Sequence, residues 1–273
     1  MNDAPLCRNC NTPRLGPHCQ NCGQKAVGRL TLKGFFQNGL ARAFSMDRGY
    51  LRTFVGLMKR PGHVAREYVD GRRASYTNPL TYWLIAATFQ LIALWMINDI
   101  YLEAFQESIR LPMEQQPDGG EKVLEQYKTA FGTDDPVPVM AGILVKAIRA
   151  AYSYLGVIFA LSLAFFLNLF LRKKSGGENL AEQLVFALYM IGHWALLTAF
   201  ILPFSARIST TAHGVIGIVG YFVIVFVGSL QFHQRGYKAA FASALSMLLA
   251  FLIYFVVMLI VMVGFMIAGS ELF

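Results

Sequence analysis

Ionisable side chains are scarce in this chain, because Asp, Glu, Lys and Arg make up only 15% of its 273 residues. Hydrophobic residues make up 55%, and the mean hydropathy is +0.46. A typical soluble domain contains about 25% charged residues, so the composition excludes an ordinary soluble domain. It predicts an all-α integral membrane protein instead.

Cysteine is absent after Cys22, and residues 1–30 lack the apolar central region of a secretory signal. The four cysteines form two short pairs, Cys7-x2-Cys10 and Cys19-x2-Cys22. A gap of two residues lets one tight turn aim two thiolates at one ion, and two such turns complete a tetrahedron. We therefore predict a small zinc ribbon over residues 1–26. Its Zn²⁺ is structural, since four thiolates leave no open coordination position for a water nucleophile.

Two alternatives to the zinc site stay open at the level of sequence. The cysteines could form two disulfides, or they could be unligated thiols. His18 is an alternative ligand to one cysteine. Reduced thiolates would place the N-terminus in the cytoplasm.

Charged residues are absent from the middle of every predicted membrane span, and known catalytic motifs are absent from the whole chain. The chain has no nucleophile elbow, zinc-protease helix, P-loop or dinucleotide fingerprint. Transmembrane enzymes and coupled transporters usually retain ionisable groups at membrane depth. The polar residues left there are Gln90, Asn168 and His193. We interpret them as hydrogen-bonding groups between helices, with the lining of a solute path as the alternative and His193 as the candidate for proton or metal binding.

Residues 27–79 form a basic amphipathic segment. Apolar residues recur at three- and four-residue steps between Leu30 and Met58, which predicts two helices too polar to span a membrane. Pro61 predicts the start of a further short helix over residues 62–69, and Gly71 its C-terminal cap. Seven cations are the predicted contacts with anionic lipid or a protein partner: Arg48, Arg52, Lys59, Arg60, Arg66, Arg72 and Arg73. The alternative is a topology signal whose helices pack on the ends of the spans, and the adjacent apolar segment disfavours nucleic acid as the partner.

Residues 80–273 are predicted to form a five-span bundle. The predicted spans are 80–97, 152–171, 184–204, 215–232 and 241–268. Between the first two lies an acidic outer loop, residues 98–138, which we expect to be irregular except for a short helix over residues 121–131.

The distribution of charge predicts the orientation of these spans. The segments predicted inside hold most of the lysines and arginines: 1–79, 172–183 and 233–240. Lys146 and Arg149 are the main exceptions. The N-terminus is therefore expected in the cytoplasm and the C-terminus outside. His233 is expected to be solvated or lipid-facing in the last inner loop.

Several short motifs in the N-terminal part of the chain resemble motifs of a known protein family. They are the cysteine pairs with Gly16-Pro17-His18-Cys19, then Asp47-Arg48-Gly49, Arg60-Pro61-Gly62, Gly71-Arg72-Arg73 and Tyr76-x-Asn78-Pro79. Over residues 5–85 the chain resembles an uncharacterised bacterial family of zinc-ribbon membrane proteins of unknown function. The resemblance implies a protein of the bacterial inner membrane and carries over no catalytic residue.

Three functional hypotheses follow from the sequence. The first is a non-enzymatic inner-membrane protein whose zinc ribbon and basic segment form a platform for anionic lipid or a cytoplasmic protein partner. The second is a transporter or channel for a small or lipid-like solute. The third is a membrane enzyme that acts on lipid, so the question of enzymatic activity stays open. The sequence allows an oligomer without specifying one.

Overall fold

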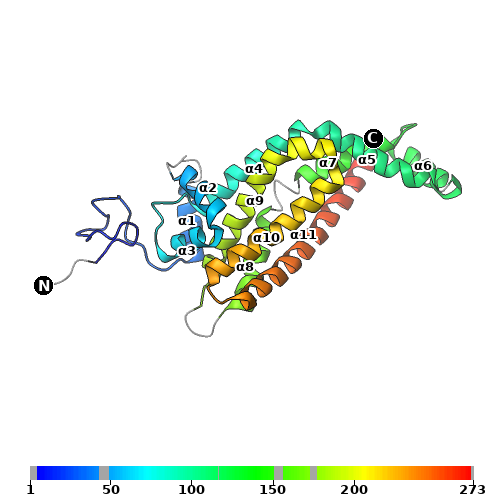
Figure 1. Ribbon diagram of the computed structural model, residues 1–273. Helices are drawn as coiled ribbons and strands as arrows, with labels where there is room; N and C mark the ends of the chain where they lie inside the picture. The colour runs from blue at the N-terminus through cyan, green and yellow to red at the C-terminus, as the bar shows by residue number, and fades with distance from the viewer. Residues whose placement is uncertain (1–4, 43–48, 116, 151–155, 173–176, 272–273) are drawn as a thin grey trace. The chain divides into compact units, whose positions relative to one another are not determined.

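The computed structural model describes residues 5–42, 49–115, 117–150, 156–172 and 177–271 (Figure 1). Its regular elements are α-helices, and two isolated β-bridges pair Leu6 with Pro13 and His18 with Lys25. The chain divides into two compact units. The first unit comprises Met1–Thr88, Ala160–Leu197 and Ile218–Ala250, and the second comprises Phe89–Phe159, Thr198–Gly217 and Phe251–Phe273.

Three short helices follow the cysteine pairs in the first unit. They are α1 (Leu32–Arg42), α2 (Tyr50–Lys59) and α3 (Pro61–Asp70). Helix α3 begins at Pro61, where the missing N–H costs no intrahelical hydrogen bond. It ends at Gly71, which adopts φ +116° and directs its N–H to the last carbonyls of the helix. The predicted start and stop of this helix are confirmed.

Longer apolar helices make up the rest of the first unit and part of the second. They are α4 (Pro79–Met96), α8 (Gly156–Leu171), α9 (Leu180–Ile208), α10 (Thr210–His233) and α11 (Tyr237–Glu271). Of these, α4, α9, α10 and α11 are long and apolar enough to cross a membrane, which indicates a multi-pass membrane protein. Helix α8 has 16 residues, and residues 152–155 of that predicted span lie outside the described part. The count of five spans stays a prediction.

Helix α9 is the most buried of the long helices. Within its most apolar stretch 78% of the residues are buried, against 11% in α11. Tyr189, Phe186 and Met190 of α9 are completely covered, whereas Leu248 and Phe255 of α11 are about half exposed. A helix that is apolar on every side belongs in the interior, and exposed apolar side chains on a long helix suit contact with lipid.

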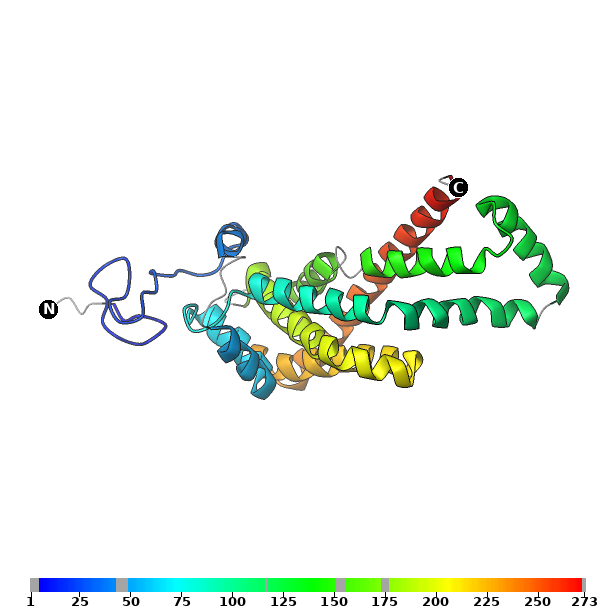
Figure 2. The same cartoon turned by 90° about the horizontal axis from the view of Figure 1, so that it is seen from above.

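The segment predicted as an irregular acidic loop is helical, so that prediction is wrong. The second unit contains α5 (Asn98–Glu114), α6 (Pro117–Phe131) and α7 (Val137–Ala150). Helices α5 and α7 lie side by side, with α6 joining their far ends (Figure 2). The expected helix over residues 121–131 is the C-terminal part of α6.

Packing explains why these helices form despite residues that usually break helices. Phe131, Met140 and Ile143 form a small buried cluster, and Ile109 and Tyr127 pack against it. Pro112 falls in the last turn of α5, and Pro117 begins α6 at the position where proline is favoured. Pro117 thus starts a helix and Pro112 lies close to a helix end, so neither proline interrupts a helix in its middle.

Candidate metal centre and cationic groove

The four cysteine sulfurs lie together in the first unit. All four Sγ atoms are within 4.8 Å of one another, with Cys7 and Cys22 3.6 Å apart and Cys10 and Cys19 3.5 Å apart. A tetrahedral zinc site with Zn–S bonds of about 2.3 Å has S···S edges of about 3.8 Å. All four cysteines are free thiols, so the two-disulfide alternative is not supported. The cluster has the geometry to hold a metal ion.

The two cysteine turns repeat each other at a spacing of 12 residues. The amide of Cys7 donates to the Thr12 carbonyl, and the amide of Cys19 donates to the Gln24 carbonyl, both at 2.9 Å. Asn11 and Gly23 occupy the same position of the turn with φ of +57° and +71°. The repeat is visible in the sequence as the motif Pro-x-Cys-x-Asn-Cys, which occurs once from Pro5 and once from Pro17. It was not among the sequence-based predictions.

Polar neighbours favour the thiolate form at one of these cysteines. The Thr12 hydroxyl lies 3.4 Å from Cys10 Sγ and, with the Thr12 backbone, lowers the pKa of Cys10 to about 6. Asn21 Nδ2 donates to the same hydroxyl oxygen, which leaves the hydroxyl hydrogen for the sulfur. Burial raises the pKa of Cys22 to about 11, so a bound cation is what would hold all four thiolates together.

Gln24 connects the cysteine module to the segment after α3. Its side chain is only 8% exposed, and its Nε2 donates to the Gly71 carbonyl at 2.8 Å. Its Oε1 accepts hydrogen bonds from the amides of Arg73 (3.0 Å) and Ala74 (2.8 Å). One buried side chain therefore satisfies three backbone groups of a segment about 50 residues away in sequence.

Other contacts also join the cysteine module to the segment after α3. The Ser75 hydroxyl donates to Asn9 Oδ1 at 2.9 Å, and Arg73 donates to the Gly28 carbonyl at 2.9 Å. A Cβ at Gly71 would come within 2.6 Å of the Arg8 side chain, so glycine permits both the left-handed cap and this close approach. The cysteine module is held against the chain that leads into α4.

Two buried carboxylates join the segments that the sequence predicts on the inner side. Glu182 is 5% exposed and forms a bidentate pair with Arg29 at 2.9 and 3.0 Å. Glu178 is 7% exposed and pairs with Arg66 at 3.1 Å and with Arg235 at 2.7 Å. Neither residue was predicted from the sequence as part of a site. The available signal was Asn179-x-x-Glu182, which forms a capping box at the start of α9.

The seven predicted contact cations divide into two groups. Arg66, Arg72 and Arg73 bind other parts of the protein: Arg66 pairs with Glu178, Arg72 with Glu67 at 3.0 Å, and Arg73 with Gly28. Arg48 lies outside the described residues. The remaining three have exposed side chains without an ion pair or hydrogen bond in the described part of the chain: Arg52, Lys59 and Arg60.

These three cations line a groove between α2 and α3. The groove has a volume of about 290 Å³, and its walls consist of Arg52, Val55, Gly56, Lys59, Arg60, His63, Val64, Glu67 and Tyr76. We call this site the cationic groove. A Cβ at Gly56 would lie 2.8 Å from the Val64 side chain, so glycine lets the two helices approach here.

Helix α2 presents apolar side chains next to the cationic groove. Leu51, Val55 and Met58 are 73%, 45% and 54% exposed. The opposite side of α2 buries Thr53 and Leu57 completely. The helix is therefore anchored on one face and offers an apolar stripe on the other.

The three polar residues predicted at membrane depth have different surroundings. His193 is 1% exposed, and its Nδ1 lies 2.8 Å from the Tyr82 hydroxyl while its ring packs edge-on against Phe54. Gln90 is buried and donates to Thr198 Oγ1 at 3.4 Å. Asn168 is half-buried in α8. For His193 and Gln90 these bonds agree with the interpretation as interhelical hydrogen-bonding groups.

His233 is buried, so the prediction of a solvated or lipid-facing side chain is wrong. It lies at the end of α10, 4% exposed, with Nδ1 2.9 Å from the Ser229 hydroxyl. Its Nε2 lies 3.1 Å from Gln183 Oε1, and the Ser229 hydroxyl is 2.7 Å from that of Ser243. These bonds connect α9, α10 and α11, which explains why an apparently exposed loop residue is covered.

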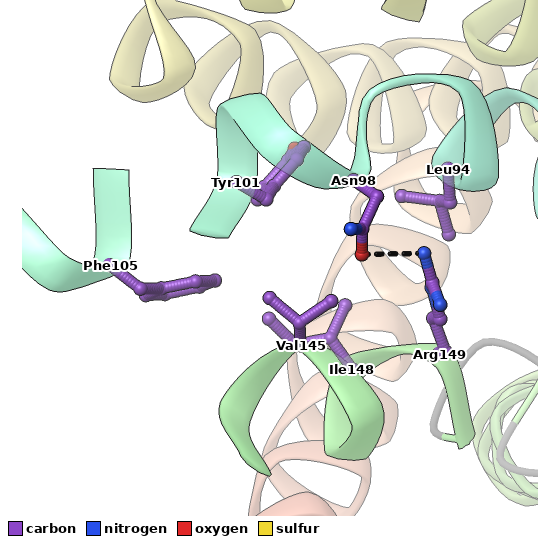
Figure 3. A pocket seen from close by; sticks show the side chains of 7 residues that line it. All are labelled: Leu94, Asn98, Tyr101, Phe105, Val145, Ile148 and Arg149. Atoms are coloured by element: carbon purple, nitrogen blue, oxygen red, sulfur yellow. Dashed lines mark hydrogen bonds between the residues drawn. The ribbon is translucent and has the colours of Figure 1, made fainter. Parts of the chain in front are cut away.

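The second unit contains a small cavity between α4, α5 and α7. Arg149 of α7 donates to Asn98 Oδ1 at 2.7 Å beside the apolar side chains of Leu94, Val145 and Ile148 (Figure 3). The cavity has a volume of about 10 Å³, which is room for a single water molecule at most. Arg149, one of the two exceptions to the predicted charge pattern, is thus held by a hydrogen bond between helices.

Comparisons with known proteins find one family model that part of the chain resembles. Residues 47–91 match the family described as "Protein of unknown function (DUF3667)". No curated protein and no solved structure matches the chain. The matched residues include α2, α3, the cationic groove and residues 79–91 of α4.

Proposed function

We propose that this chain is a non-enzymatic, multi-pass protein of the bacterial inner membrane that presents a cytoplasmic platform to anionic lipid. The platform consists of the cysteine module, with structural Zn²⁺ held by its four thiolates, together with α1, α2 and α3. A cytoplasmic protein is the alternative occupant of the same surface.

The observation that carries the proposal is the combination of surfaces on α2. Leu51, Val55 and Met58 form an exposed apolar stripe, and Arg52 and Lys59 stand beside it without a protein partner in the described part of the chain. An amphipathic helix of this kind lies in the membrane interface with its apolar face down and its cations at the lipid phosphates. Each cation near an anionic leaflet contributes on the order of 1 kcal/mol, so the exposed set would hold the platform on the membrane surface.

The metal centre supports this function by ordering the platform. A module of about 20 residues cannot bury a hydrophobic core, and a metal ion substitutes for one. Gln24 and Asn9 connect the module to residues 71–75, so metal binding would order the segment that leads into α4. The zinc site thus has a structural role.

Photocrosslinking tests the proposal with the full-length protein in nanodiscs. A photoreactive phenylalanine analogue in place of Met58 should crosslink to lipid, and crosslinking should rise when anionic lipid replaces part of the zwitterionic lipid. The same analogue in place of Asp70, which is exposed at the end of α3, is the control and should give little lipid adduct.

Two results would count against the proposal. Equal lipid crosslinking at both positions would show that the apolar stripe has no specific contact with the bilayer. Crosslinking from position 58 to a co-purified protein, without lipid adducts, would favour the protein partner.

A further inference from the structure

We infer that the cationic groove is a binding site for a lipid headgroup that carries a phosphate monoester. The inference rests on the proposed function, because the groove meets headgroups only if α2 lies at the membrane surface. It goes further by assigning one site and one class of ligand.

The charge of the groove walls fits a dianion. Arg52, Lys59 and Arg60 contribute three positive charges and Glu67 contributes one negative charge, which leaves a net charge of +2 when His63 is neutral. A phosphate monoester carries a charge of about −1.5 to −2 at neutral pH, whereas a phosphodiester carries about −1. The monoester therefore matches the groove in charge, and a diester leaves about half of that charge uncompensated.

Glu67 directs both carboxylate oxygens to other residues and forms no ion pair with Arg52, Lys59 or Arg60. Its Oε2 accepts a hydrogen bond from the Tyr76 hydroxyl at 2.5 Å, and its Oε1 accepts one from Arg72 at 3.0 Å. Burial, with the hydrogen bond to Glu67, raises the pKa of Tyr76 to about 12, so the hydroxyl stays protonated and keeps donating. The three cations are thus left without an ion-pair partner in the described part of the chain, while the charge of Glu67 still counts in the net charge of +2.

The shape of the groove also suits a headgroup. A volume of about 290 Å³ accommodates a phosphate with part of a glycerol backbone, and arginine side chains bind phosphate oxygens in bidentate fashion. Val55 lines the groove and also belongs to the exposed apolar stripe of α2. A lipid whose phosphate occupied the groove could therefore direct its acyl chains along that stripe into the bilayer.

Lipid retention measured by native mass spectrometry tests this site. Full-length protein is incubated with equal amounts of short-chain phosphatidic acid, a monoester, and short-chain phosphatidylglycerol, a diester. We expect preferential retention of phosphatidic acid. Arg52→Gln, Lys59→Gln or Arg60→Gln should each weaken that retention about fivefold, since each removes one cation from the site.

Two further variants separate charge at the site from charge elsewhere. Lys238→Gln removes an exposed cation of the first unit outside the groove and should leave the preference unchanged. Arg60→Lys keeps the charge but loses the bidentate geometry, and it should retain more of the binding than Arg60→Gln. Equal retention of the two lipids, or an equal loss in Lys238→Gln, would overturn the inference.

Competition by a soluble phosphate monoester tests whether the ligand of the groove is a lipid. Glycerol 3-phosphate, which has the same headgroup without acyl chains, should compete weakly with short-chain phosphatidic acid. If it competed equally well, the lipid assignment would be wrong. Lipid crosslinking from position 58 does not depend on the preference for a monoester, so this inference can fail while the proposed function stands.

Discussion

Gln24 connects the cysteine module to residues 71–74 of the first unit by hydrogen bonds. It follows Cys22 by two residues, and its buried amide satisfies Gly71, Arg73 and Ala74 at the same time. An unsatisfied buried backbone group costs about 1–3 kcal/mol, so loss of this side chain affects a segment about 50 residues away in sequence. The position of Gln24 is fixed by the second cysteine turn, because the Cys19 amide donates to its carbonyl.

Removal of the metal should therefore loosen residues 71–75 as well as the cysteine module. In Cys22→Ser we expect loss of bound zinc and faster hydrogen–deuterium exchange at the Arg73 and Ala74 amides. Gln24→Ala should keep the metal and still accelerate exchange at those two amides by roughly tenfold or more.

Gln20→Ala is the matched control, because Gln20 is exposed in the same cysteine turn. It should change neither the metal content nor the exchange. Unchanged exchange at Arg73 and Ala74 in Gln24→Ala would show that the module does not order this segment.

Among the elements, those defined by local signals were predictable from the sequence. Pro61 and Gly71 gave the bounds of α3, and the short cysteine spacings gave the metal cluster, because in each case the deciding residues are close in sequence. The pair of Arg29 with Glu182 joins residues 153 positions apart, and no local pattern relates them. Helix α5 was missed for the same reason, since packing in the second unit outweighs the helix-breaking residues around it.

The close contact between α3 and α10 predicts that a larger side chain at Gly62 destabilises the protein. The Gly62 amide donates to Gln231 Oε1 at 2.9 Å, and a Cβ at Gly62 would clash with the carbonyl of Gly228. Gly62→Ala should therefore destabilise the protein by about 1–3 kcal/mol, because the two helices must separate. The measurement is the melting temperature of the detergent-solubilised protein.

Gly142→Ala is the control for this prediction. A Cβ at Gly142 of α7 would meet nothing within 4 Å, so alanine should stabilise that helix by about 0.5–1 kcal/mol. Similar melting temperatures for the two variants would contradict the close contact between α3 and α10.

At the scale of the whole molecule, the segments that the sequence predicts on opposite sides of the membrane belong to different units. The described residues of all three inner segments, 1–79, 172–183 and 233–240, fall in the first unit. The predicted outer segments 98–138 and 205–214 fall in the second. Ion pairs of Glu178 and Glu182 join the inner segments to one another, as expected for chain segments on one side of a membrane.

Cysteine accessibility in intact cells tests the orientation on which the cytoplasmic platform depends. Thr129→Cys in α6 and Lys238→Cys at the start of α11 each add one thiol at an exposed position, and the parent protein controls for the four native thiols. With a membrane-impermeant thiol reagent, we predict labelling at position 129 in intact cells and at position 238 only after the membrane is opened. Labelling at position 238 in intact cells, with protection at position 129, would contradict a cytoplasmic platform.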